Sequence, residues 1–163
     1  MLGIVGGVGP LAGIDLFKKI TEQTSATTDQ EHLPVILFSF PHRIKDRTDY
    51  LEGKVKENPG TAIGEICIEL YKSGALVAGI PCNTAHSDEI YNVIQDTLNL
   101  NNCPLKIIHM IDVTVDHIRR TFPQKSAIGV LSTTGTHKQK IYYNRLIQAG
   151  YFPLVPGDSQ IIR

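Results

Sequence analysis

Residues 2–24 read LGIVGGVGPLAGIDLFKKITEQT, in which an apolar run, a glycine-rich turn and an amphipathic segment follow one another directly. The run Leu2–Val5 predicts a strand buried on both faces, because its apolar residues do not alternate with polar ones. Pro10–Thr24 predicts a helix, since proline suits the first helical turn and apolar residues recur along one face. A strand that runs through a short loop into a helix is the repeating unit of parallel α/β proteins.

The same unit repeats along the rest of the chain. The other predicted strands are Val35–Phe40, Leu76–Ile80, Leu105–Met110, Ala127–Leu131 and Tyr151–Val155. The other predicted helices are Pro59–Ser73, His86–Leu98, Ile111–Phe122 and His137–Ala149. This alternation predicts an α/β fold of parallel sheets with flanking helices. The polar stretch 99–104 predicts a boundary between a first α/β lobe, residues 1–103, and a partial second α/β lobe, residues 104–163.

Composition and charge argue against several classes of partner. Sixteen basic and sixteen acidic residues give a net charge of zero, so we expect neither nucleic acid nor an anionic membrane surface as a partner. No apolar run approaches about 18 residues and no charged leader precedes one, so we expect a soluble, cytoplasmic protein. The three cysteines are widely spaced and the histidines lack metal-ligand spacing, so we expect no disulfide framework and no metal.

Three strand-to-helix loops contain residues suited to ligand binding, because ligands of parallel sheets bind at the carboxyl ends of the strands. In the first loop, Gly7, Val8 and Gly9 would let the backbone approach an anion at the helix N-terminus, although a tight turn without a ligand explains the glycines equally well. Gly7-x-Gly9-x-x-Ala12 also fits a permissive dinucleotide pattern. No acidic residue ends the next strand to bind a ribose, so no nucleotide cofactor is expected.

The second loop, residues 81–86, reads PCNTAH. Cys82 is predicted to lie at the start of a helix, where the macrodipole favours a thiolate, and Asn83 and Thr84 add donors beside the sulfur. A small buried side chain without reactivity is the alternative, and it is the expected role of Cys67 and Cys103.

The third loop, residues 132–136, reads STTGT, and its hydroxyls would either cap the next helix or bind a carboxylate at its N-terminus. The sequence DRT at residues 46–48 follows the second strand. Arg47 there would bind a carboxylate through two parallel N–H bonds, or it is a solvated surface charge.

Taken together, the motifs GGVGPLA at 6–12, DRT at 46–48, PCNTAH at 81–86 and TTGT at 133–136 resemble the aspartate/glutamate racemase family, in its aspartate racemase branch. The resemblance implies a cofactor-independent amino-acid racemase with two pseudo-symmetric α/β lobes. It also implies that one thiol from each lobe flanks the α-carbon of a small acidic amino acid or dicarboxylate. Inversion requires this arrangement, because one group removes the α-proton while the other protonates the opposite face.

The resemblance assigns roles to individual residues. Cys82 would be the catalytic thiol of the first lobe. The groups that bind the substrate would be Gly7, Val8, Gly9, Arg47, Asn83, Thr84, Thr133, Thr134 and Thr136.

The family's second thiol normally lies in a Gly-Cys-Thr-Glu string, which this chain does not contain, so we expect a C-terminally truncated member. The family's last helix, which packs on the first lobe, would then also be absent, and the exposed apolar surface favours a homo-oligomer, a dimer. Two alternatives stay open: a non-catalytic dicarboxylate-binding remnant, and a single-cysteine relative that is a decarboxylase or a cis–trans isomerase.

Overall fold

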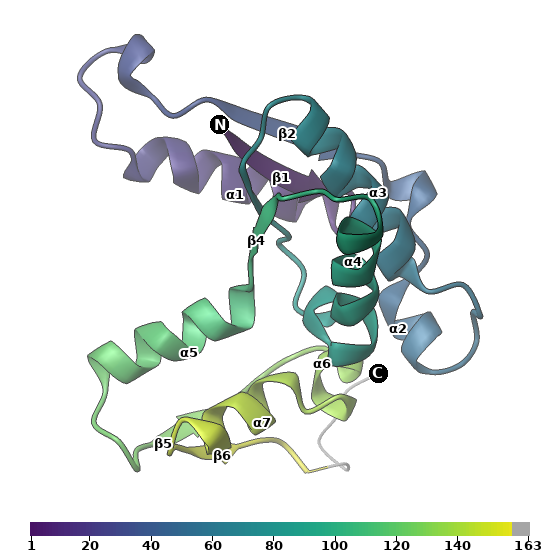
Figure 1. The fold of residues 1–163 in the computed structure, drawn as a ribbon. Coiled ribbons are helices and arrows are strands. Elements are labelled where there is room, and N and C mark those ends of the chain that lie inside the picture. The colour runs from purple at the N-terminus through teal and green to yellow at the C-terminus, as the bar shows by residue number, and fades with distance from the viewer. Residues whose placement is uncertain (158–163) are drawn as a thin grey trace.

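The computed structural model describes residues 1–157 and contains the predicted alternation of strands and helices (Figure 1). The strands are β1 Leu2–Gly6, β2 Val35–Ser39, β3 Val77–Gly79, β4 Lys106–Ile108, β5 Ala127–Gly129 and β6 Phe152–Leu154. The α-helices are α1 Pro10–Gln23, α2 Arg47–Leu51, α3 Pro59–Lys72, α4 Asp88–Leu100, α5 Met110–Thr121, α6 Thr134–Lys138 and α7 Ile141–Gln148. Short 3-10 turns lie at Asp29–Glu31, Pro41–Arg43 and Thr84–His86.

Two parallel sheets organise these elements. The first has the strand order β2-β1-β3-β4, and the second consists of β5 and β6. In the first sheet Leu2 pairs with Val35 on one side and with Val77 on the other, so β1 is a central strand. The carboxyl ends of these strands therefore lie along one edge, and the loops that follow them gather there. The predicted α/β class is confirmed.

The position of β4 corrects the predicted boundary. Lys106–Ile108 was expected in the second lobe, 104–163, but Val77 of β3 pairs with Lys106, so β4 extends the first sheet beyond residue 103. The polar stretch 99–104 contains the end of α4 and the connection from α4 to β4, which is a strand of the first sheet. Its polar composition resembles that of a linker between lobes, which is why the boundary was predicted there. The division into two lobes stays a proposal, and residues 158–163 of the expected second lobe lie outside the described residues.

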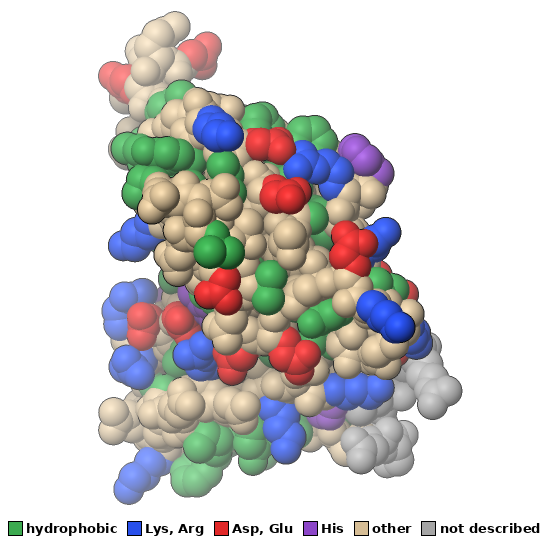
Figure 2. All heavy atoms as spheres, turned by 45° about the vertical axis from the view of Figure 1, so that its right-hand side comes forward, with side chains coloured by type: hydrophobic (Ala, Val, Ile, Leu, Met, Phe, Trp, Pro, Cys, Tyr) green, Lys and Arg blue, Asp and Glu red, His purple; other side chains and the backbone are tan. Residues whose placement is uncertain are grey.

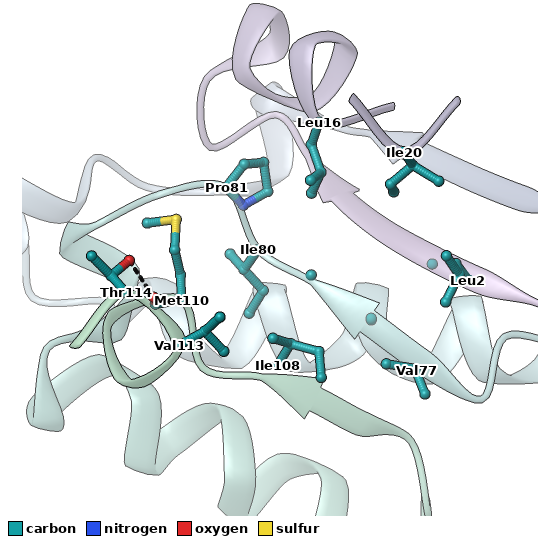
Figure 3. A pocket seen from close by; sticks show the side chains of 13 residues that line it. Leu2, Leu16, Ile20, Val77, Ile80, Pro81, Ile108, Met110, Val113 and Thr114 are labelled. Carbon is teal, nitrogen blue, oxygen red and sulfur yellow. Dashed lines mark hydrogen bonds between the residues drawn. The ribbon is translucent and has the colours of Figure 1, made fainter. Parts of the chain in front are cut away.

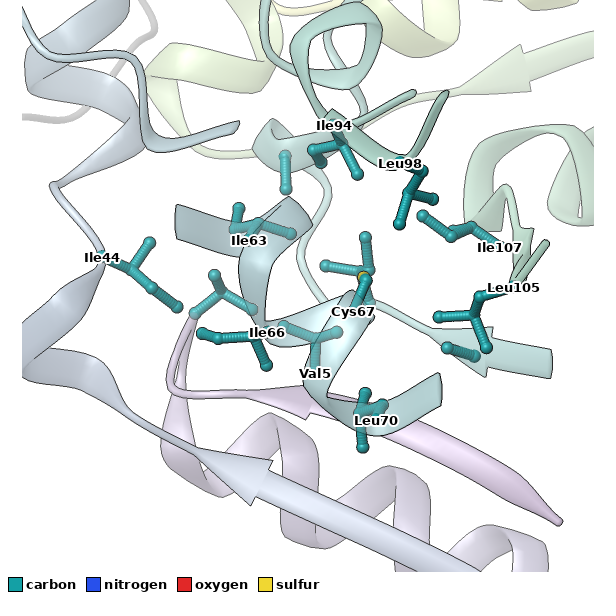
Figure 4. Packing of buried hydrophobic residues seen from close by; sticks show 14 of the residues in the cluster. Val5, Ile44, Ile63, Ile66, Cys67, Leu70, Ile94, Leu98, Leu105 and Ile107 are labelled. Atoms are coloured by element: carbon teal, nitrogen blue, oxygen red, sulfur yellow. The ribbon is translucent and has the colours of Figure 1, made fainter. Parts of the chain in front are cut away.

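The main hydrophobic core lies between the first sheet and α3. Helix α1 packs on β1 and β2, α3 packs on the same two strands, and α4 packs on α3 (Figure 1). Figure 4 shows that side chains from β1, α3, α4 and β4 meet in this core, among them Val5, Ile66, Leu70 and Ile94. Fully burying one such aliphatic side chain contributes about 1.5–3 kcal/mol to the stability of the fold. This cluster therefore stabilises the sheet from which the loops extend.

One predicted helix is divided in the structure, and one observed helix was not predicted. The predicted helix His137–Ala149 is two helices, α6 and α7, because Lys140 has a left-handed backbone with φ of 51° and interrupts the hydrogen-bond ladder. Helix α2 was not predicted. Its N-cap is Asp46, whose carboxylate accepts a hydrogen bond of 2.9 Å from the Asp49 backbone N–H. A helix of five residues is too short to give an apolar periodicity.

The surface is mixed in charge. On the face in Figure 2, acidic and basic side chains are interspersed rather than gathered by sign. Among residues 1–157, no helix combines the length and the apolar character that crossing a bilayer requires.

Candidate functional site

The glycine-rich loop after β1 is a tight turn. Gly7 and Gly9 have φ of 83° and 123°, values that favour glycine. A Cβ on Gly7 would lie 2.8 Å from the Pro41 backbone nitrogen, so the loop packs directly on the end of β2. The Gly9 carbonyl accepts the N–H groups of Ala12 and Gly13 and starts α1. The turn by itself accounts for both glycines.

Arg47 joins this loop to α2. Its Nη2 donates a hydrogen bond of 3.3 Å to the Val8 carbonyl. Its Nε is buried and has no hydrogen-bond partner among the described residues. A buried N–H without an acceptor costs about 1–3 kcal/mol, so an acceptor supplied by a ligand would be favourable here. The hydrogen bond to Val8 places Arg47 beside the glycine-rich loop.

Cys82 follows β3 and is half-buried, and its backbone is bonded on both sides. Its N–H donates to the Ile80 carbonyl at 2.8 Å, and its carbonyl accepts from His86 Nδ1 at 2.8 Å. The predicted helix start at His86 is wrong, because Thr84–His86 is a separate 3-10 turn and α4 begins at Asp88. The dipole of α4 therefore does not begin at the thiol.

The other two cysteines have different surroundings. Cys67 is completely buried in the core on α3, and burial raises the pKa of its thiol to about 12. Cys103 is half-buried and packs against the same core, as Cys82 also does, but it lies in the segment that joins α4 to β4. Of the three thiols, only that of Cys82 lies in a loop that follows the carboxyl end of a strand.

A pair of hydroxyls joins the loops at 81–86 and 132–136. Thr84 Oγ1 and Thr136 Oγ1 lie 3.1 Å apart, and Thr136 Oγ1 is 3.3 Å from Thr133 Oγ1. Thr84 and Thr136 are both buried. The hydrogen bond between their hydroxyls therefore replaces bonds that these groups would otherwise make to water. This pair connects the two loops, and Thr133 and Thr134 lie at its edge, at the N-cap and first residue of α6.

Helices α2 and α6 pack closely against each other. A Cβ on Gly135 would lie only 2.7 Å from Thr48 Oγ1, so α6 approaches α2 at a distance that a side chain at position 135 would prevent. Lys138 Nζ reaches Glu52 Oε1 at 2.7 Å. The hydrogen bonds from Lys138 and Lys54 lower the pKa of the Glu52 carboxyl to about 2. These contacts bring Arg47 and Thr134, at the starts of the two helices, to the same region.

Two features of the site were missed by sequence reasoning. Tyr142 of α7 donates a hydrogen bond of 2.8 Å to Asn83 Oδ1, and burial raises the pKa of this tyrosine, which keeps it neutral. His86 is 1% exposed and packs against Tyr91 and His109. Burial lowers the pKa of His86 to about 4. The short spacing from Cys82 to His86 was the available signal for the second feature, whereas residue 142 has no sequence signal that relates it to Asn83.

A groove of about 300 Å³ on the α1 face of the first sheet has a different character (Figure 3). Its lining includes Leu16 from α1, Val77 from β3 and Val113 from α5. The hydroxyl of Thr114, the one polar side chain in the lining, donates to the Met110 carbonyl at 2.8 Å. The groove therefore offers no free side-chain donor to a carboxylate and is not part of the candidate site.

The candidate site thus combines one thiol, one guanidinium, one amide and several hydroxyls. Within residues 1–157, no three His, Cys, Asp or Glu side chains are grouped so that they could hold a metal ion. A thiol can take up or release a proton, and the neighbouring N–H and O–H groups can bind oxygen atoms that bear negative charge.

The chain is similar to known racemases in sequence and in structure. Broad specificity amino-acid racemase RacX of Bacillus subtilis is 27% identical over 146 residues, which cover 87% of this chain and 58% of that protein. The structure of Picrophilus torridus aspartate racemase matches with a TM-score of 0.80 and 27% identity, over 97% of this chain and 63% of that one. The structure of a putative Asp/Glu racemase from Yersinia pestis shares the fold, with a TM-score of 0.74 and 23% identity over 97% of this chain and 65% of that one.

The chain spans about three fifths of the length of these relatives. A sequence model of the family described as Asp/Glu/Hydantoin racemase matches residues 5–162, which include the glycine-rich loop, Arg47 and Cys82. The chain therefore belongs to the Asp/Glu/Hydantoin racemase family.

Proposed function

We propose that this chain provides the first lobe and part of the second lobe of a cofactor-independent amino-acid racemase, in which Cys82 transfers the α-proton of a small acidic amino acid. The observation that carries the proposal is the position of Cys82. Its half-buried thiol follows β3 in the loop that hydrogen-bonds to the third loop through Thr84 and Thr136. Arg47 reaches the glycine-rich loop from the neighbouring helix α2.

The donors suit an acidic amino acid. The unpartnered Nε of Arg47 offers an N–H to a carboxylate, and a guanidinium binds carboxylates through parallel hydrogen bonds. Tyr142 occupies Asn83 Oδ1, which leaves the Asn83 amide N–H groups to donate. Donors held in place in this way stabilise the negative charge that develops on the substrate when the α-proton leaves.

The reaction also needs an acid on the opposite face of the α-carbon. Cys67 is a poor candidate, because it belongs to the core and its pKa is raised to about 12. Cys103 packs against that core between α4 and β4, ahead of a strand rather than after one. We propose that the second acid comes from the part of the family architecture that this chain does not span.

The test is exchange of the substrate α-proton. The chain is incubated with L-aspartate or L-glutamate in deuterated water, and α-deuterium is measured by NMR. We expect exchange in the wild type and in Cys103→Ser, and none in Cys82→Ser. Absence of exchange with both amino acids would contradict the proposal.

A dicarboxylate-binding protein without turnover is the second candidate. The observation that favours it is the position of the other two thiols in residues 1–157, since Cys67 is completely buried in α3 and Cys103 lies between α4 and β4. Neither lies in a loop that follows the carboxyl end of a strand, as Cys82 does. Calorimetric titration with aspartate separates the two, because binding without α-deuterium exchange supports this second candidate. The expected homodimer stays a prediction, which light scattering after size-exclusion chromatography tests.

A further inference from the structure

His86 lies behind the Cys82 loop in an aromatic cage. Its ring stacks on Tyr91 of α4 with centroids 5.6 Å apart, and it meets the ring of His109 edge-on at 4.7 Å. Tyr91 and His109 are themselves in edge-on contact at 4.6 Å. The residue is 1% exposed, so its ring is fixed by packing on two sides and is closed off from solvent.

The hydrogen bond of His86 determines its tautomer. Nδ1 lies 2.8 Å from the carbonyl oxygen of Cys82, and a carbonyl oxygen can only accept, so Nδ1 carries the hydrogen. Burial lowers the pKa of His86 to about 4, and the ring is therefore neutral near pH 7. A neutral ring that already donates from Nδ1 cannot use that nitrogen as a base towards the thiol.

We infer that His86 is a positioning residue for Cys82, acting through the Nδ1–H bond to the Cys82 carbonyl; this inference rests on the proposed function. The carbonyl belongs to the peptide between Cys82 and Asn83. The bond therefore holds both the backbone that carries the thiol and the backbone N–H of the next residue. On its other side, the same loop is held by the bond from Tyr142 to Asn83.

The alternative is that His86 merely fills space. Tyr91 and His109 surround the ring, and a flat apolar ring would satisfy that packing equally well. Packing does not require a donor aimed at the carbonyl of Cys82, so variants that separate ring from donor distinguish the two roles. His86→Phe keeps a flat ring without the donor. His86→Asn keeps a nitrogen donor close to the position of Nδ1 but loses most of the ring.

The primary experiment measures amide hydrogen exchange by mass spectrometry, comparing peptides that cover residues 82–87 with peptides of α3. Loss of one neutral hydrogen bond should make the loop exchange about five-fold faster in His86→Phe, relative to α3. His86→Asn should restore a rate close to that of the wild type. Tyr91→Leu is the matched control, since it removes the stacked ring and leaves the donor. It should lower overall stability without changing the ratio of loop to α3 exchange.

The second readout is α-deuterium exchange of L-aspartate. His86→Phe should lower its rate about five-fold with an unchanged dissociation constant, and His86→Asn should recover most of the rate. Equal effects of His86→Phe and Tyr91→Leu on loop exchange, or failure of His86→Asn to restore it, would overturn the inference. If the wild type does not exchange the aspartate α-proton at all, the proposed function fails, whereas amide exchange still decides whether His86 holds the Cys82 loop.

Discussion

Acidification should destabilise this protein through His86, well above the pH at which carboxylates titrate. Burial lowers the pKa of His86 to about 4 in the folded chain, against its usual value of 6.5. The unfolded chain therefore takes up a proton at higher pH than the folded chain does. The contribution of His86 to the free energy of unfolding is fully present above the pKa of this histidine in the unfolded chain, about 6.5. It is lost as the pH falls from about 6.5 towards 4.

The magnitude follows from this difference in pKa. The full loss would be about 3 kcal/mol, of which about 2 kcal/mol falls between pH 7.5 and pH 5. His109 acts in the same direction, because burial also lowers its pKa, although Asp112 opposes that shift. Glu52 contributes little in this interval, since its usual pKa of 4.5 and its pKa of about 2 in the folded chain both lie below pH 5.

The assay is urea unfolding at pH 7.5 and pH 5.0 at constant ionic strength. The stability of His86→Asn should fall about 2 kcal/mol less than that of the wild type over this interval, whatever its absolute stability. His117→Asn, on the exposed part of α5, is the matched control and should lose as much stability as the wild type. An equal loss in His86→Asn and the wild type would refute the assignment of His86 as a buried neutral ring.

Three further predictions concern the site. Iodoacetamide near neutral pH should modify Cys82 before Cys67, because burial raises the pKa of the Cys67 thiol to about 12; peptide mass spectrometry measures the order, and earlier labelling of Cys67 would contradict it. Gly135→Ala should lower the free energy of unfolding by about 1–3 kcal/mol, since its Cβ would lie 2.7 Å from a threonine hydroxyl of α2. The control Gly129→Ala meets no atom within 4 Å, and equal urea midpoints for the two variants would argue against close packing of α2 and α6. Arg47→Lys should weaken aspartate binding in calorimetry about ten-fold, because an ammonium cannot form the parallel pair of bonds; an unchanged affinity would remove Arg47 from the proposed binding set.

Much of the fold could be predicted from the sequence, because the signals are local. The apolar run at Leu2–Val5 and the proline at the start of α1 act through burial and backbone geometry within a few residues. Each of the six predicted strands overlaps one observed strand. Helix α2 was missed, and so was the interruption at Lys140, since one capping side chain or one left-handed residue does not alter an apolar periodicity measured over many residues.

The sequence by itself determined the fold class, the family and the loops that carry candidate site residues. Strand patterns, turn glycines and short motifs each depend on residues that are close together in the chain. Only the tertiary structure decided that β4 completes the first sheet and that Thr84 pairs with Thr136. It also decided that His86 is buried with its donor on the Cys82 carbonyl. Residues 84 and 136 are 52 positions apart, and a partner at that separation is selected by packing. The lowered pKa of His86 likewise depends on groups, distant in the sequence, that exclude water from its ring. A local sequence pattern does not indicate which groups these are.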